Sequence, residues 1–510
     1  MTVRCKIVSS LTPSDLAFLP ATEQLAALAA KEVSSTELVE LYLSRIDTHN
    51  PSLNAIVTLD AETARRDAKN ADTARARSQP LGRLHGLPIT VKDSYETAGM
   101  RTVCGRPDLA GNLPTEDAVA VARLRNAGAI ILGKTNMPTG NQDVQTSNPV
   151  FGRTNNPWDL SRTSGGSAGG GAAATAAGMT SFDYGSEIGG STRIPAHFCG
   201  LYGHKVTWRS VPLVGHIPNG PGNPGRWGEP DMACAGVVVR GARDIIPAIE
   251  ATVGPIDPGG GFSYTLAPPR ATALGDFRVA VWVDDPDCPV DNDVHSAIDD
   301  VAAALRDAGA RVAAHPASVP VDLRASHHVF TSLAAAAFSI DRSTISPLSG
   351  AAIALRSIRH PRGEAAGIIR ATSQSHRAWL FADAARHEIR HRWPRFFADF
   401  DVLLLPVTPT AAPVHHNKDH DRLGRRIGVN GTSRSYWDQL KWNALANIAG
   451  APATTMPITV NSAGLPIGIQ VMGSPGDDRT TVEFAALLTD VLGGYRIPPR
   501  YQTSSASTTE

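Results

Sequence analysis

A chain of 510 residues, 42% hydrophobic and 19% charged, has the composition of a globular protein. Its 48 Lys and Arg residues balance its 48 Asp and Glu residues, so it has no basic surplus with which to bind nucleic acid or an anionic membrane surface. No apolar run reaches the roughly 18 residues that a membrane span requires.

The N-terminal residues lack the apolar core of a secretory signal, and the five cysteines are widely scattered with no Cys-x-x-Cys pair. This pattern argues against a disulfide framework and against a structural zinc site. We therefore expect a cytoplasmic protein with reduced thiols and no membrane partner.

The first predicted elements form an α/β unit. Ser34 and Glu37 have the spacing of a capping box ahead of an amphipathic helix. The apolar run 87–91 is typical of a short buried strand that ends at Lys92 and Asp93. Because Asp93 follows this strand, it is predicted to hold local backbone rather than to act in catalysis.

A helix followed at once by a strand recurs along the chain. Thr115 is predicted to cap a helix that stops at Gly128, and a strand follows at 129–132. Another step has a strand at 278–283, a helix at 294–308 and a strand at 311–313. Further elements are expected as strands at 401–405, 454–458 and 467–472 and as a helix at 479–492. This alternation predicts an α/β fold, with a largely parallel or mixed sheet covered on both faces.

Residues 161–203 contain many Gly and Ser residues that neither the helical nor the strand period explains. Glycine lets backbone N–H groups converge on a ligand, which an active site needs and a packed core does not. The run Ile188-Gly189-Gly190-Ser191 is therefore predicted to direct N–H groups at a developing oxyanion. Lys92, at the end of a buried strand, is suited to serve as a base because burial lowers the pKa of a lysine.

The motifs of this region resemble those of the amidase signature family. In the family's order the chain contains VKD, GKTNMP, GGSAGG, GGSTRIPA and CGLYGHK, and residues 404–406, 447–453 and 464–470 are similar to it as well. Three positions depart from the family's pattern: Ala168, Glu187 and the segment 204–206. The resemblance covers most of the chain and implies one large α/β domain, with a central twisted mixed β-sheet covered by helices on both faces.

The resemblance also implies a Ser–cis-Ser–Lys triad. Ser191 corresponds to the nucleophile, and Ser167, on a cis peptide bond after Gly166, to the proton relay to the base Lys92. An acyl-enzyme would form on Ser191 and be hydrolysed by water. Asn141 and Gly166 are predicted to contact the substrate, while no cofactor and no metal are expected.

The domain is predicted to span residues 1–501, with its motif core at 86–207. Two segments, about 212–230 and 318–426, are expected to vary with the substrate and to line the pocket, the first as a loop over the mouth of the site. The Ser/Thr-rich residues 502–510 are predicted to be a disordered tail.

Other interpretations of these motifs are weaker. Residues 165–169 also fit Gly-x-Ser-x-Gly, which would make Ser167 the nucleophile of an α/β-hydrolase, but residues 157–162 do not look like the strand that this elbow requires. His415, His416 and His420, with Asp419 and Asp421, resemble a metal cluster in composition only, because they lack the glutamate of His-Glu-x-x-His.

The predicted function is hydrolysis of a carboxylic amide, either a small or an aryl amide, with carbamates and esters as further candidates. The partner would be a small-molecule substrate, and whether the chain forms a homodimer is left open. One alternative is the glutamine-hydrolysing subunit of an amidotransferase. The other is a catalytically inert binding protein on the same scaffold.

Overall fold

The computed structural model describes residues 12–217, 229–257, 259–314, 318–338, 351, 354–355, 358–359, 371–417 and 419–502. Most of the predicted loop at 212–230, namely residues 218–228, lies outside these ranges, and so does the predicted tail at 502–510 except for residue 502. No helix within the described ranges is long and apolar enough to cross a membrane.

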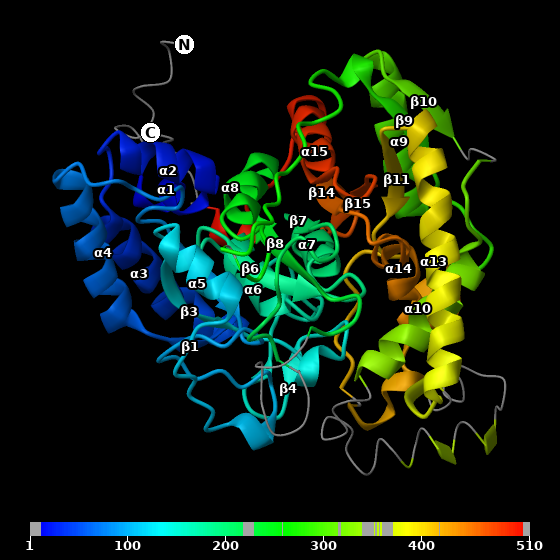
Figure 1. Cartoon of the computed structure of the whole chain (residues 1–510), viewed down its shortest axis with the longest axis horizontal. Coiled ribbons are helices and arrows are strands. Elements are labelled where there is room, and N and C mark those ends of the chain that lie inside the picture. Colours follow the sequence, from blue (N-terminus) through cyan, green and yellow to red (C-terminus); the bar gives the residue numbers. More distant parts are fainter. Residues whose placement is uncertain are drawn as a thin grey trace, which may run out of the picture.

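One mixed sheet of 11 strands organises the molecule (Figure 1). Its strands run, in spatial order, β1 (Ile56–Leu59), β3 (Ile130–Thr135), β2 (Pro88–Lys92), β6 (Asp183–Glu187), β8 (Cys234–Val239), β7 (Tyr202–Lys205), β14 (Ala453–Val460), β15 (Pro466–Met472), β11 (Val402–Pro406), β9 (Arg278–Val281) and β10 (Arg311–Ala314). Parallel pairs lie toward the two ends, where β2 pairs with β3 and β6, and β9 with β10 and β11. The middle of the sheet, from β6 to β15, is antiparallel.

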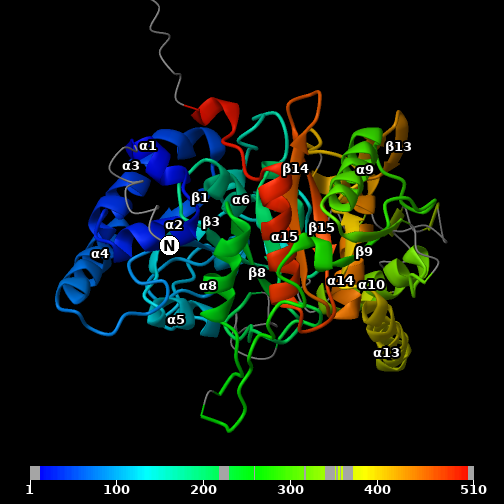
Figure 2. The ribbon, with the colours of Figure 1, turned by 90° about the horizontal axis from the view of Figure 1, so that it is seen from above.

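Helices cover both faces of this sheet, as the resemblance implies. On one face α8 (Ile245–Glu250), α15 (Asp478–Leu492) and α9 (Asn292–Asp307) follow one another across the sheet, from its central strands toward β10 (Figure 2). On the other face α6 (Gly169–Ala176) and α7 (Arg193–Cys199) contact each other and the central strands. The fold is thus the predicted single mixed α/β unit.

The remaining helices extend the unit at its two ends. The N-terminal end holds α1 (Pro13–Phe18), α2 (Ala21–Ala29), α3 (Ser35–Leu53), α4 (Ala61–Ala76) and α5 (Val119–Asn126). At the opposite end α10 (Leu323–Phe338), α13 (His376–Asp399) and α14 (Lys441–Ala449) pack against one another (Figure 1). Two small hairpins complete the fold: β4 (Ser147–Asn148) with β5 (Gly152–Arg153), and β12 (Arg426–Val429) with β13 (Thr432–Ser435).

Most predicted elements are confirmed within a few residues. The side chains of Ser34 and Glu37 form the predicted capping box at the start of α3. The prediction that Thr115 caps the next helix is wrong, because α5 begins only at Val119. Loop contacts satisfy the donors there, since the N–H of Ala118 donates to the Glu96 carbonyl at 2.8 Å and that of Val119 to the Val214 carbonyl at 3.0 Å.

The glycine-rich region contains more regular structure than its sequence indicates. Helices α6 and α7 and strand β6 all lie within it, and every residue of these three elements is buried. Residues 157–162 form no strand, as predicted, so the α/β-hydrolase elbow has no strand ahead of Ser167.

Candidate active site

Two parallel strands bring the base and the glycine-rich loop together. Strand β2 ends at Lys92, and its parallel neighbour β6 ends at Glu187, just before Ile188-Gly189-Gly190-Ser191. Because parallel strands end at the same edge of a sheet, residues that are far apart in the sequence meet there. The turns after these strands lead to the other predicted residues.

Lys92 and Ser167 are in direct contact and both are fully buried. The Lys92 Nζ donates to the Ser167 Oγ at 2.7 Å, and to the Ser186 carbonyl at 3.0 Å. Burial lowers the pKa of Lys92 from 10.5 to about 7, while Asp183 and Glu187 act more weakly in the opposite direction. A neutral amine is therefore available at Lys92 near neutral pH.

The Gly166–Ser167 peptide bond is cis, as the resemblance implies. Gly166 is required at this position by close backbone contact. A Cβ atom there would lie 2.5 Å from the carbonyl oxygen of Asp143 and 2.8 Å from the carbonyl carbon of Val144. The segment after Asn141 thus packs directly against the turn that carries Ser167.

Asn141 lies beside the same serine. Its Oδ1 is 3.4 Å from the Ser167 Oγ, which donates to it, and its Nδ2 donates to the Ile217 carbonyl at 2.9 Å. Asn141 has a backbone φ of 65°, a left-handed conformation that Asn adopts more readily than most residues. Of the two predicted substrate contacts, Asn141 is thus placed next to the reacting groups.

Ser191 joins this cluster through its backbone. Its carbonyl accepts the N–H of Ala168, the residue after Ser167, at 3.0 Å. Its side chain is partly exposed, whereas those of Lys92 and Ser167 are buried. The Ser191 backbone is therefore tied to the turn that carries Ser167, whose buried hydroxyl contacts the buried amine of Lys92.

The loop 188–191 is held by the carboxylate of Glu187. This carboxylate accepts the N–H of Gly190 and that of Thr192, each at 3.3 Å, and the Thr192 hydroxyl at 2.5 Å. Burial opposes its ionisation, but the charge and hydrogen bonds of Arg193 outweigh that cost and lower the pKa of Glu187 to about 2. Glu187, one of the positions that depart from the family's pattern, thus takes part in fixing the loop.

The four predicted oxyanion donors differ in what they contact. The N–H of Gly190 is already directed at Glu187. Across the described part of the chain, the N–H groups of Ile188, Gly189 and Ser191 donate to no protein acceptor. Gly189 packs closely under Phe330 of α10, since a Cβ on Gly189 would lie 2.8 Å from the Phe330 ring.

Sequence reasoning missed two polar residues of the site. Ser186 of β6 presents its Oγ 3.3 Å from the Lys92 Nζ, and that Oγ lies 2.7 Å from the Nε2 of His216. Both residues are buried. Ser186 lies three residues before the motif GGSTRIPA, whereas His216 lies in a loop with no motif that would mark it.

The predicted structural role of Asp93 fits its contacts. Its carboxylate accepts the N–H of Cys104 at 2.9 Å and that of Val103 at 3.1 Å. Asp93 is fully buried and shares a polar cluster with Lys134. It fixes the loop after β2 and makes none of the contacts to the Ser167 hydroxyl.

Two of the histidines singled out in the sequence, His415 and His416, belong to no metal-binding group of the described residues. His416 packs edge-on against Tyr436, with 5.1 Å between the ring centroids. The side chains of Asp419, His420 and Asp421 lie outside the described part of the structure. Among the described residues, no three His, Cys, Asp or Glu side chains form a group that could hold a metal ion.

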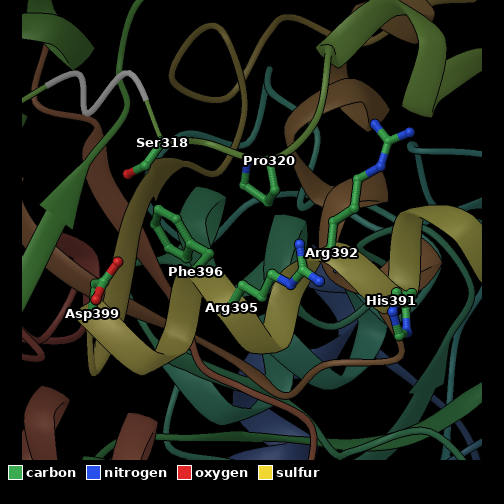
Figure 3. A pocket seen from close by; sticks show the side chains of 7 residues that line it. All are labelled: Ser318, Pro320, His391, Arg392, Arg395, Phe396 and Asp399. Carbon is green, nitrogen blue, oxygen red and sulfur yellow. The ribbon is translucent and has the colours of Figure 1, made fainter.

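A surface pocket lies apart from the cluster around Lys92. It is formed by α13 and the segment 318–320, and Figure 3 shows basic side chains of α13 around it. The residues that line it are Ser318, Pro320, His391, Arg392, Arg395, Phe396 and Asp399. None of them is a predicted catalytic residue, so this pocket is separate from the candidate active site.

Comparison with known proteins finds one family and several relatives that match most of the chain. Residues 37–482 match the Amidase family. A glutamyl-tRNA(Gln) amidotransferase subunit of Anaeromyxobacter sp. (strain K) is 32% identical, over 96% of this chain and 99% of that protein. Indoleacetamide hydrolase of Bradyrhizobium diazoefficiens is 30% identical, over 93% of this chain and 86% of that protein. Among solved structures, that of 6-aminohexanoate cyclic dimer hydrolase complexed with substrate superposes with a TM-score of 0.77 at 26% identity, covering 95% of this chain and all of the other.

Proposed function

Since this chain belongs to the amidase family and is a hydrolase of C–N bonds other than peptide bonds, we propose that it hydrolyses a carboxylic amide through an acyl-enzyme on Ser191. The observation that supports this most directly is the 2.7 Å contact between the Lys92 Nζ and the Ser167 Oγ in a fully buried setting. A hydroxyl in contact with an amine of lowered pKa is poised to pass protons.

The proposed reaction proceeds in two steps. The Ser191 Oγ attacks the amide carbonyl carbon while its proton passes to Ser167, whose own proton passes to Lys92. The same relay returns a proton to the leaving amine as the C–N bond breaks, which leaves an ester on Ser191. Water then attacks that ester by the reverse route and releases the carboxylic acid.

We assign the oxyanion donors to the backbone N–H groups of the loop 188–191. Ile188, Gly189 and Ser191 offer donors without a protein acceptor in the described residues, so they are favoured over Gly190. Donors fixed before the reaction stabilise the charge that develops on the carbonyl oxygen. The contact of Phe330 with Gly189 places an apolar side chain beside these donors, which favours a substrate with an apolar or aromatic group.

The substrate class we favour is a small or aryl amide, with carbamates and esters as secondary substrates of the same acyl chemistry. The similarity to indoleacetamide hydrolase supports an arylacetamide. The second candidate is a glutamine-hydrolysing component of an amidotransferase, which the similarity to the Anaeromyxobacter protein over 96% of the chain favours.

The test is turnover by the purified chain, without any partner, of an arylacetamide, an anilide, a carbamate, an ester and glutamine. We expect hydrolysis of the arylacetamide, and Ser191→Ala to abolish it together with fluorophosphonate labelling. Ser164→Ala is the matched control, because the Ser164 Oγ is buried in the same region and has no partner among the described residues. Glutamine as the sole substrate would favour the second candidate, and full activity of Ser191→Ala would refute the mechanism.

A further inference from the structure

The amine of Lys92 has three neighbours along the directions in which it can form hydrogen bonds. They are the Ser167 Oγ at 2.7 Å, the Ser186 carbonyl oxygen at 3.0 Å and the Ser186 Oγ at 3.3 Å. A neutral amine carries two hydrogens and one lone pair, so one of these neighbours must face the lone pair. Lys92 can accept the proton of Ser167 only when the lone pair points at Ser167.

The two groups of Ser186 differ in what they permit. A carbonyl oxygen only accepts, so the Ser186 carbonyl always takes one hydrogen of the amine. A hydroxyl both accepts and donates, so the Ser186 Oγ can take the second hydrogen or offer its own proton to the lone pair. The second orientation would set Ser186 in competition with Ser167 for the base.

His216 is the group that contacts this hydroxyl from the other side. Its Nε2 lies 2.7 Å from the Ser186 Oγ, and its ring packs edge-on against Tyr95 with 4.9 Å between centroids. The Tyr95 hydroxyl in turn donates to the Gly185 carbonyl at 2.9 Å, so the ring rests on the strand that carries Ser186. Tyr95 and His216 also form a backbone bridge, which fixes the loop.

His216 is neutral in this environment. Burial, followed by the positive charges of Lys92 and Lys134, lowers the pKa of His216 to about 3. A neutral imidazole has one nitrogen that donates and one that accepts, so His216 is able to accept at Nε2. Its Nδ1 is buried and has no hydrogen-bond partner among the described residues, so only the contact at Nε2 distinguishes the two tautomers.

We propose that His216 is a positioning residue that accepts the proton of the Ser186 hydroxyl at Nε2. This contact keeps the Ser186 oxygen as an acceptor toward Lys92, so that of the three neighbours described above Ser167 is the one that can face the lone pair. The inference rests on the proposed role of Lys92 as the base. It adds a device that orients the base, and His216 itself touches no reacting atom.

The opposite tautomer of His216 would act against catalysis. With the proton on Nε2, the imidazole would donate to the Ser186 Oγ, and the Ser186 proton would be directed at the Lys92 lone pair. The two tautomers therefore make opposite predictions for variants of His216 and Ser186.

Three single variants separate these roles. His216→Phe keeps a ring against Tyr95 but removes the acceptor, and we expect kcat to fall about tenfold or more with KM unchanged. His216→Gln places an amide oxygen near the position of Nε2, and we expect it to restore most of kcat. Ser186→Ala removes the hydroxyl that could compete, and we expect it to lose less activity than His216→Phe.

The deciding experiment is the double-mutant cycle with Ser186→Ala and His216→Phe. We expect His216→Phe to change kcat by less than about twofold in the Ser186→Ala background, because no hydroxyl remains to be oriented. Equal losses in both backgrounds, equal losses in the Phe and Gln variants, or an inactive Ser186→Ala would each overturn the inference. Thermal unfolding of every variant is the control that tests whether the chain is folded.

Failure of this inference is distinguishable from failure of the proposed function. If Ser191→Ala and Lys92→Met are inactive while His216→Phe has the kcat of the parent, only the role of His216 is wrong. If Lys92→Met retains activity, the base itself is misassigned and the inference falls with it.

Discussion

The two buried lysines at the ends of neighbouring strands show how the same residue type can serve two purposes. Lys92 ends β2, and Lys134 lies opposite Val91 in the parallel strand β3. Both side chains are fully buried, and burial lowers the pKa of each. Their partners differ.

The partners determine what each lysine can do. Lys92 contacts the hydroxyls of Ser167 and Ser186, which can exchange protons with it. Lys134 instead donates to the Tyr95 carbonyl and, at 2.8 Å, to the Thr97 Oγ1, and it lies near the carboxylate of Asp93. We infer that burial alone does not mark a lysine as a base, and that contact with a hydroxyl able to exchange protons with it does.

The largest expected effect is that of Lys92→Met on activity. We expect kcat to fall by about a thousandfold or more, because members of a coupled triad act as a unit. Stability should be no lower than that of the parent, since the described residues offer Lys92 no carboxylate in contact, and methionine removes a buried amine that is costly to ionise. Steady-state kinetics measure the effect on activity, and thermal unfolding measures the effect on stability. A folded variant with near-normal turnover would show that Lys92, like Lys134, is not needed for catalysis.

Lys134→Met should show the opposite pattern. Its loss leaves the Tyr95 carbonyl without this donor and Asp93 without the nearby cation, so we expect a loss of stability of about 2–4 kcal/mol. We expect the folded fraction to keep measurable kcat, in contrast to Lys92→Met. Denaturant unfolding gives the stability, and a fully stable but inactive Lys134 variant would contradict the structural role.

The sequence allowed the strand before Lys92 to be predicted, but not the strand before the loop 188–191. Residues 87–91 are mostly apolar and are typical of a buried strand, which the structure contains as β2. Strand β6, with the sequence DYGSE, has no hydrophobic alternation although all five of its residues are buried. Its polar side chains are satisfied by distant partners, since Thr90 and Thr135 donate to Asp183, and Arg193 pairs with Glu187.

The same reason explains which residues of the candidate site could be predicted from the sequence. Ser191, Ser167 and Lys92 were predicted because the motifs that contain them resemble those of the amidase signature family. Ser186 and His216 act through Lys92, and their importance lies in distances of 3.3 Å and 2.7 Å that no local pattern encodes. Contacts between segments far apart in sequence become visible only once the sheet is formed.

The pH dependence of activity offers a smaller but more direct measure of the Lys92 environment. Because the pKa of Lys92 is lowered from 10.5 to about 7, and only the neutral amine accepts a proton, kcat/KM should rise through about pH 7 and level off above it. A rise delayed to pH 10 would mean that Lys92 is solvated like an ordinary surface lysine. A flat profile from pH 5 to 9 would contradict its role as base.

Asp183 allows this profile to be shifted without touching the triad. Its buried carboxylate lies close enough to both lysines to favour their charged forms, and its Oδ1 accepts the Thr90 hydroxyl at 2.8 Å and the Thr135 hydroxyl at 3.0 Å. Burial raises the pKa of Asp183 to about 7, so its carboxylate is mainly charged only above that pH. Asp183→Asn retains an oxygen for these bonds but removes that charge, so the pKa of Lys92 should fall slightly and the upper part of the rise in kcat/KM should move to lower pH. Thr90→Val is the matched control, since it removes one hydrogen bond and leaves the charge. A shift to higher pH in Asp183→Asn would mean that the Asp183 carboxylate does not raise the pKa of Lys92.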